Sequence, residues 1–388
     1  MQVALLREWQ AGERRVALVP EAVAKLVQLG HRVEVESGAG LEAHYPDDAY
    51  RQAGATIAPS RAALLAAADM VLGLRPPLAD PEFLQQLRPG CALIGLLQPL
   101  TEAVEHFQAL AERGVLSFSL DAMPRISRAQ SMDVLSSMST IAGYRAVIMA
   151  AERLGKFFPM LITAAGTIAP AQVLVLGAGV AGLQAIATAH RLGAVVRAFD
   201  TRPVVREQVE SLGASFLTLE VQGEQTGEGY AQALSQTSHE EELRQLSAPV
   251  AAADVVITTA LVPGQRAPIL ITQQMVEAMR PGSVIVDLAA EAGGNVELSR
   301  PGEVVDHGGV LILAPLNVPS QVPLPASQLF SRNLVTFIQH LLASGLSWTG
   351  DPPAAEIALE DEIVRRTAIT YRGEVVSELV RPRLAGNP

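Results

Sequence analysis

The chain has 388 residues, with 29 Lys and Arg against 40 Asp and Glu, and so a formal net charge of −11. Hydrophobic residues make up 49% of it, which is enough for one or two large cores and argues against a disordered chain. The acidic balance gives no electrostatic basis for binding nucleic acid. The single cysteine, Cys91, cannot form an intrachain disulfide, and residues 1–12 lack the pattern of a signal peptide. We therefore expect a cytoplasmic, two-domain enzyme without a membrane segment.

Short apolar runs alternate with amphipathic segments through the first part of the chain. The expected strands and helices are, in order, 3–6, 20–29, 32–35, 69–74, 82–87, 92–97, 102–112 and 115–118. Strands that alternate with helices at this spacing are typical of a parallel α/β sheet. The polar stretch 121–133 ends this series, and residues 134–154 have the length and composition of one long helix.

A second series of β-rich runs follows, each run leading into a helical pattern. These runs are 172–176, 194–199, 255–259, 284–288 and 310–313. We predict two doubly wound, Rossmann-like parallel-sheet domains joined by long helices. The expected domains are 1–133 plus 325–388, and 134–324. Residues 328–342 form a predicted helix, and 362–377 a predicted terminal hairpin around Arg372-Gly373 that returns to the first domain.

The most specific local pattern is a glycine loop between a predicted strand and a predicted helix. Gly177 permits a sharp turn, Gly179 lets a pyrophosphate approach the backbone, and Gly182 lets helix and strand pack closely. The N-terminus of the helix that follows, with Val180 beside it, then faces the anion. Asp200 follows 18 residues after the last glycine, at the end of the next strand. Together these features predict a dinucleotide site; a glycine turn that serves only packing is the alternative.

Asp200 is expected to accept hydrogen bonds from the ribose hydroxyls of the adenosine and to repel a 2′-phosphate, which favours NAD over NADP. Thr201 and Arg202 directly follow it and belong to the same candidate site. The Arg202 side chain could pair with a phosphate, although an arginine after a strand is more commonly solvated. None of the histidines has the spacing of a metal ligand, so no metal site is predicted.

The glycine loop does not specify a reaction, but residues 123–146, MPRISRAQSMDVLSSMSTIAGYRA, are more informative. This stretch closely resembles the signature of the NAD(H)-binding domain of proton-translocating nicotinamide nucleotide transhydrogenases. The resemblance continues through the opening segment 7–20, the glycine loop, 260–264, 287–294 and the terminal hairpin. The opening and the glycine loop are shared with alanine dehydrogenases, whereas the 125–133 loop distinguishes the two.

The resemblance implies which side chains surround the nicotinamide. In the family, an arginine, a glutamine, an aspartate and a nearby serine lie around the nicotinamide. The matching residues of this chain are Arg125, Gln130, Asp133 and Ser136. The resemblance also matches Tyr230 to a tyrosine that ends a mobile loop and folds over the nucleotide, and it places Ala260 and Leu261 at the nucleotide. The alternative for the 125–133 loop is an interdomain hinge whose polar groups satisfy one another.

The resemblance also implies the reaction and the assembly. NADH bound to this chain would pass hydride to NADP⁺ on a partner subunit, while protons move through separate membrane segments. The chain would form a homodimer and lie at the inner face of the plasma membrane through its partners.

Two other functions stay open at this stage. An alanine dehydrogenase shares the two-domain plan, but its substrate site needs a lysine and a histidine. The matching segments here, 71–77 and 94–100, hold no lysine and have Gln98 at the histidine position, while Glu291 matches an acidic position near that enzyme's site. The other alternative is a non-catalytic module that senses NAD(H).

Overall fold

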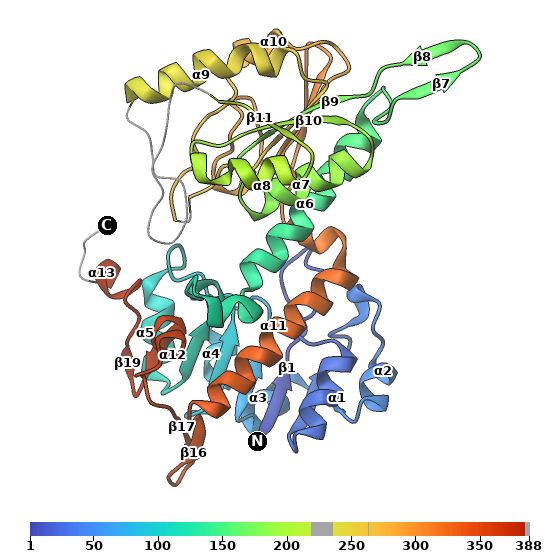
Figure 1. The fold of residues 1–388 in the computed structure, drawn as a ribbon. Coiled ribbons are helices and arrows are strands. Elements are labelled where there is room, and N and C mark those ends of the chain that lie inside the picture. Colours follow the sequence, from blue (N-terminus) through green and yellow to red (C-terminus); the bar gives the residue numbers. More distant parts are fainter. Residues whose placement is uncertain (219–235, 263, 385–388) are drawn as a thin grey trace. The chain divides into compact units, whose positions relative to one another are not determined.

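The computed structural model describes residues 1–218, 236–262 and 264–384, and it divides into two compact units (Figure 1). Unit 1 combines Met1–Met138 with Ser320–Pro388, and unit 2 is Ser139–Pro319. Each unit is built on one mostly parallel sheet, which confirms the predicted α/β class.

The sheet of unit 1 has eight strands in the order β19-β18-β6-β5-β4-β1-β2-β3. Its parallel part comprises β1 (Gln2–Leu5), β2 (Arg32–Glu36), β3 (Thr56–Ala58), β4 (Met70–Leu72), β5 (Ala92–Gly95) and β6 (Leu116–Ser119). The connecting helices are α1 (Pro20–Gln28), α2 (Asp47–Gln52), α3 (Arg61–Ala67), α4 (Pro81–Gln86) and α5 (Val104–Glu112). Side chains stabilise several first turns: Ser60 accepts a hydrogen bond from Ala63 N, and Asp80 from Glu82 N.

The end of the chain completes this sheet. Strand β18 (Ala368–Tyr371) pairs antiparallel with β6 and with β19 (Glu374–Val375), so the predicted return of a terminal hairpin is confirmed. The hairpin is shorter than predicted, because residues 362–367 form helix α12 (Glu362–Thr367). The Asp361 carboxylate caps this helix by accepting from Ile363 N and Val364 N. Helix α13 (Arg381–Leu384) and the β16 (Ser347–Thr349)–β17 (Ala354–Glu356) ribbon also belong to unit 1.

Helix α11 (Pro323–Ala343) fixes the opening segment of unit 1 in place. Its Ser327 hydroxyl accepts from Val16 N at 3.0 Å, and its Ser331 hydroxyl accepts from Val19 N at 2.9 Å. These serines are four residues apart and therefore on one face of the helix. The helix begins five residues earlier than its apolar periodicity indicated, because proline is tolerated in a first helical turn.

Unit 2 has seven strands in the order β11-β10-β9-β12-β13-β15-β14. They are β9 (Gln172–Leu176), β10 (Val195–Phe199), β11 (Ser215–Phe216), β12 (Val255–Thr258), β13 (Val284–Asp287), β14 (Val304–His307) and β15 (Val310–Leu313). All pairs are parallel except β14–β15. Numbered from β9, the order begins 3-2-1-4-5, and the switch point between β9 and β12 is where such sheets bind dinucleotides.

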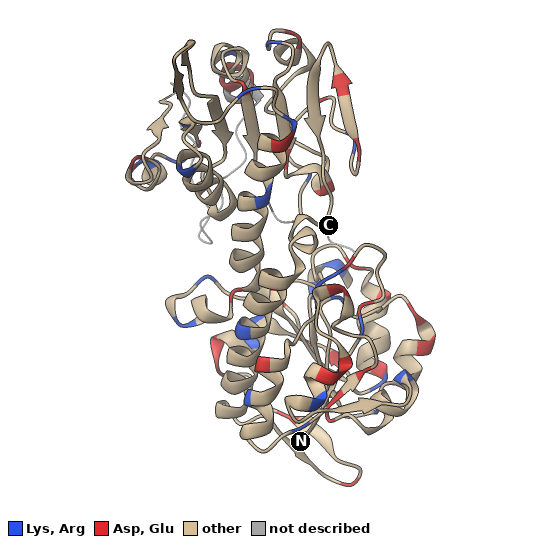
Figure 2. Ribbon diagram, turned by 90° about the vertical axis from the view of Figure 1, so that its right-hand side faces the viewer, with Lys and Arg blue, Asp and Glu red and all other residues tan. Residues whose placement is uncertain are grey.

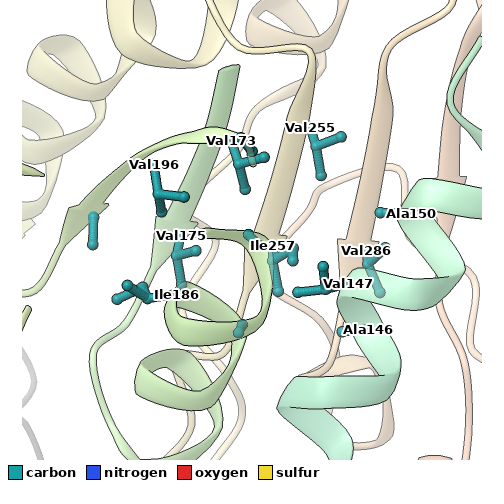
Figure 3. Packing of buried hydrophobic residues seen from close by; sticks show 14 of the residues in the cluster. Ala146, Val147, Ala150, Val173, Val175, Ile186, Val196, Val255, Ile257 and Val286 are labelled. Carbon is teal, nitrogen blue, oxygen red and sulfur yellow. The ribbon is translucent and has the colours of Figure 1, made fainter. Parts of the chain in front are cut away.

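The core of unit 2 lies between this sheet and the helices beside it. Figure 3 shows side chains of α6 (Val134–Arg153), α7 (Val180–Arg191) and four central strands packed together. Gly143 of α6 lets α7 approach closely, since a Cβ there would lie 2.1 Å from the Ala181 carbonyl oxygen. The other α-helices in the described part of unit 2 are α8 (Arg206–Ser211), α9 (Gln236–Ala251) and α10 (Gln273–Glu277).

Helix α6 is the one helix of the described chain that is long and apolar enough to cross a membrane by length and composition alone. Core helices of soluble proteins pass the same test, and the second half of α6 supplies Ala146, Val147 and Ala150 to the unit 2 core. We therefore treat α6 as a core helix.

An exposed antiparallel hairpin, β7 (Leu161–Thr163) and β8 (Gly166–Ile168), follows α6 and had not been expected from the sequence. The Ile162 side chain is 69% exposed, and Phe157, Met160 and Ile168 are also exposed. Residues 157–171 contain no Asp, Glu, Lys or Arg. Elsewhere acidic and basic residues are interspersed in both units (Figure 2).

Candidate functional site

The glycine loop of unit 2 joins β9 to α7 as a tight turn. Gly177 has φ +97°, and a Cβ there would lie 2.6 Å from Thr259 Oγ1. A Cβ on Gly182 would lie 1.9 Å from the Gly177 carbonyl oxygen. At Gly179, by contrast, no atom lies within 4 Å of a Cβ position. Packing therefore requires glycine at the first and third positions, while the second leaves the backbone open to a ligand.

The start of α7 presents backbone N–H groups at this open position. Gly179 is the N-cap residue and has no side chain to bond the first turn, and Val180 is 39% exposed. The first N–H groups of a helix lack partners within it and carry a partial positive charge. This end of α7 is thus suited to hold a pyrophosphate.

Asp200 lies directly after β10, 8% exposed, beside the glycine loop. Its Oδ2 atom accepts a hydrogen bond from Ala178 N at 2.8 Å, which ties the carboxylate to the loop. The predicted neighbourhood of the glycines and Asp200 is therefore present in unit 2.

Arg202 is not the solvated surface residue that its position after a strand suggested. Its Nε and one terminal nitrogen donate to the two oxygens of Asp200 at 2.8 and 2.7 Å, and its backbone N donates to Oδ1 at 2.9 Å. The Arg202 side chain is only 13% exposed, and this pairing raises its pKa further. Thr201 between them is half-buried.

Ala260 and Leu261 follow β12 at the same edge of the sheet. Asn295, which is fully buried, accepts from Ala260 N at 3.1 Å and donates to the Ala260 carbonyl at 2.9 Å. Asp287 at the end of β13 in turn accepts from Asn295 N at 2.9 Å. Leu261 is 46% exposed. Sequence reasoning did not identify Asn295, whose role depends on a contact 35 residues away.

The signature loop lies in unit 1 as a 3₁₀ turn, Ser127–Met132, followed by α6. Asp133 precedes α6 and accepts from Ser136 N at 2.9 Å and from the Ser136 hydroxyl at 2.6 Å, a helix-capping arrangement. Arg125 and Gln130 are exposed. The structure thus brings Asp133 and Ser136 into contact and leaves the arginine and glutamine accessible.

Two residues from distant parts of the sequence hold this loop. Asn333 of α11 is 8% exposed, donates to the Ser131 carbonyl at 2.8 Å and accepts from the Ser137 hydroxyl at 2.7 Å. Asp361 pairs with Arg128 at 3.1 Å and with His340 at 2.9 Å. Burial opposes ionisation of Asp361, but the hydrogen bonds that it accepts from His340, Val364 N and Arg128 lower its pKa to about 2. No local sequence pattern indicates that either residue contacts this loop.

The segments matching the dehydrogenase substrate site also lie in unit 1. Glu8 accepts from Leu74 N at 2.6 Å and from Arg75 N at 3.0 Å, and burial raises its pKa to about 7 despite these bonds. Gln98 has a left-handed backbone, φ +55°, and its N donates to Asp121 at 3.0 Å. In unit 2 the exposed Glu291 accepts from Asn317 N.

Two further expectations have a limited outcome. Tyr230 and the rest of its glycine-rich segment lie outside the described residues. Within the described ranges, no group of three or more His, Cys, Asp or Glu side chains could hold a metal ion.

Comparison with known proteins gives the same family at both ends of the chain. Residues 4–142 match the model of the alanine dehydrogenase/PNT N-terminal domain, and residues 146–378 match that of the C-terminal domain. The chain is 46% identical over 392 residues to an NAD(P) transhydrogenase alpha-subunit polypeptide of Rhodospirillum rubrum, in an alignment that covers 100% of this chain and 99% of the relative.

A solved transhydrogenase structure from Sinorhizobium meliloti superposes with a TM-score of 0.83 at 42% identity, over 97% of this chain and 99% of that one. The alanine dehydrogenase of Bacillus subtilis is more distant, at 30% identity over 98% of this chain and 94% of its own. The transhydrogenase resemblance drawn from residues 123–146 is therefore confirmed.

Proposed function

The chain belongs to the alanine dehydrogenase/PNT family, and we propose that it is the NAD(H)-binding peripheral subunit of a proton-translocating NAD(P) transhydrogenase. The observation that carries this proposal is that segments 71–77 and 94–100 lack the lysine and the histidine of the dehydrogenase substrate site, in a chain with a dinucleotide loop. When bound, NADH supplies the hydride, and NADP⁺ on a partner subunit receives it.

The residues of unit 2 fit a dinucleotide. The open face of Gly179 and the start of α7 would hold the pyrophosphate, and Asp200 would accept from the adenosine ribose. Val180, Thr201, Ala260 and Leu261 would line the same site. Because Asp200 is anionic and buried, we assign NAD(H) to this chain and NADP(H) to the partner.

The choice between two dehydrogenase-type reactions depends on proton chemistry. Oxidation of an amino acid releases a proton that a base must accept, whereas transfer between two nicotinamides releases none at the reacting carbons. An amide such as Gln98 is not a base at neutral pH. Gln98 stands where an alanine dehydrogenase has its histidine, and this favours the transhydrogenase reaction over alanine oxidation.

The signature loop would position the nicotinamide rather than move protons. Gln130 offers a donor and an acceptor to a carboxamide, Arg125 offers a charged donor, and Asp133 with Ser136 fixes where the loop meets α6. Asn333 and Asp361 hold the loop through their contacts with the Ser131 carbonyl and the Arg128 side chain, respectively. Such positioning matters because a misplacement of about 1 Å can cost on the order of 100-fold in rate.

The assembly is part of the proposal. Partner subunits would hold NADP(H) and the proton path in the membrane, and this chain would lie at the cytoplasmic face of the plasma membrane. We also propose a homodimer. The uncharged, exposed hairpin of β7 and β8 supports it, because two chains that each carry a net charge of −11 meet with least repulsion where charges are absent.

Gln130→Asn tests the assignment of the loop. We expect NADH to bind this variant within about threefold of the parent, while hydride transfer to NADP⁺ on the partner subunit falls by on the order of 100-fold. Gln85→Asn is the matched control, since Gln85 is also an exposed glutamine of unit 1 but lies on α4. Equal transfer rates in the two variants would contradict the assignment.

The same assay separates the alternatives. A chain that reduces pyruvate in the presence of ammonia would be an alanine dehydrogenase. A chain that binds NADH but transfers nothing to any added nucleotide or keto acid would be a sensor.

A further inference from the structure

The side chains around Asp200 bear on how the proposed NAD(H) site distinguishes two nucleotides that differ by one phosphate. Each carboxylate oxygen of Asp200 accepts two hydrogen bonds. Oδ1 accepts from the backbone N and from Nε of Arg202, and Oδ2 accepts from Ala178 N and from a terminal nitrogen of Arg202. The guanidinium thus makes a two-pronged contact with the carboxylate that is expected to bind ribose.

A second buried acid interacts electrostatically with Asp200. Glu242 on α9 is 3% exposed and pairs with His239 at 2.9 Å. Leu246, one helical turn later on the same face, packs in a core cluster with Phe199, the residue before Asp200. The negative charge of Asp200 adds to burial in raising the pKa of Glu242, while His239 lowers it.

The charges of this cluster sum to a negative value. Asp200 and Glu242 contribute two carboxylates, Arg202 contributes one cation, and His239 adds a second one only when it is protonated. A neutral ribose diol meets little penalty here. A 2′-phosphate, which is an anion, would meet two buried acids and a guanidinium that is already neutralised.

We propose that Arg202 is a latent phosphate ligand that Asp200 keeps occupied, and that Glu242 is a second residue excluding NADP(H) from this site. This rests on the proposed function, in which the site binds NAD(H). The guanidinium is planar and matches a phosphate in two-pronged fashion, as it matches the carboxylate now. Without Asp200, a largely buried cation would need another anion, and a 2′-phosphate would provide one.

Asp200→Ala and the double variant Asp200→Ala/Arg202→Gln test the role of the arginine. We expect Asp200→Ala to weaken NADH binding and to tighten NADPH binding by on the order of tenfold or more, the range of a charge-assisted hydrogen bond. The gain should vanish in the double variant. It should persist in Asp200→Ala/Arg206→Gln, because Arg206 is an exposed arginine directed to Thr218 and Phe216.

The outcomes separate this inference from the function beneath it. If the parent chain binds no NADH, the proposed function fails. If the parent binds NADH but Asp200→Ala gains no NADPH affinity, or gains it equally without Arg202, the latent-ligand proposal is wrong. Asp200→Asn, which keeps the shape and removes the charge, provides the same comparison if the alanine variant does not fold.

Glu242→Gln tests the second acid. We expect its NADPH dissociation constant to fall by about threefold to tenfold, with NADH binding within about twofold of the parent, because only the phosphate interacts strongly with the removed charge. Glu241→Gln is the control, since Glu241 is the neighbouring acid but pairs with Arg244 at the helix surface. An unchanged preference in Glu242→Gln, or an equal change in the control, would overturn this proposal for Glu242.

Discussion

Alanine substitutions at two glycines of the same loop should have different consequences. We expect Gly182→Ala to lower stability and Gly179→Ala to weaken nucleotide binding, because the space around the two glycines differs. A Cβ on Gly182 would lie 1.9 Å from the Gly177 carbonyl oxygen, whereas ordinary contacts begin near about 3.4 Å. The turn or α7 would have to shift by about 1.5 Å. Overpacking of this kind costs up to about 3 kcal/mol. For a unit of this size we expect Gly182→Ala to lower the Tm by about 6–12 °C.

Gly179→Ala should fold normally and bind nucleotide poorly. Its backbone is extended, with φ −76°, and no atom lies within 4 Å of the new Cβ, so only about 0.5 kcal/mol of helix capping is at stake. A methyl group would nevertheless occupy the space where the pyrophosphate approaches. Losing one charge-assisted hydrogen bond there corresponds to an NADH dissociation constant that is roughly 10- to 100-fold higher.

Thermal unfolding and NADH titration of both variants measure these effects. An unaltered NADH affinity in Gly179→Ala would refute the proposed approach of the pyrophosphate to this backbone. A Gly182→Ala protein as stable as the parent would refute the packing explanation of the third glycine.

Three further substitutions address stability and assembly. Burial raises the pKa of Glu8 from 4.5 to about 7, so the contribution of its protonated form to stability is fully present below pH 4.5 and is lost as the pH rises through 7. The difference in unfolding free energy between the parent and Glu8→Gln should therefore fall by up to about 3 kcal/mol from pH 5 to pH 8. A difference that stays constant over this range would contradict the prediction. Asn333→Leu should cost about 1–3 kcal/mol in denaturant unfolding, because it leaves the Ser131 carbonyl and the Ser137 hydroxyl unpaired; a neutral effect would show that water replaces the amide. Ile162→Glu should convert the proposed dimer to a monomer in analytical ultracentrifugation without lowering the Tm of the chain, and a persistent dimer would place the interface elsewhere.

The regions of the fold that the sequence predicted are those with a local physical cause. The turn of the glycine loop requires Gly177 and Gly182 by steric limits alone, and the alternation of β-rich runs with helices is typical of parallel sheets. One helix was expected over 134–154, and the structure has it as α6 (Val134–Arg153), with Asp133 as its cap.

The missed elements lack such a cause or have a misleading one. The exposed hairpin of β7 and β8 has apolar side chains without the alternation that identifies a half-buried strand. Residues 362–367 were assigned to the hairpin together with the strand-forming residues that follow them, whereas the capping carboxylate of Asp361 was the signal for a helix.

In the candidate site, too, the residues that could be predicted have a local pattern and the others do not. Asp200 could be located by its distance from the glycines, but the direction of the Arg202 side chain depends on the backbone after β10. Asn295 and Asn333 act across 35 and 202 residues of sequence, so no local pattern could reveal them.

The central claim is direct hydride transfer between nucleotides held by two subunits. Its most direct measurement uses NADH carrying deuterium at both hydrogens of the nicotinamide C4, mixed with this chain, NADP⁺ and an NADP(H)-binding partner subunit. The account predicts NADPH that carries one deuterium per molecule formed, with none released to water, and no formation without this chain. Deuterium lost to water, or consumption of the label only when pyruvate and ammonia are added, would contradict it.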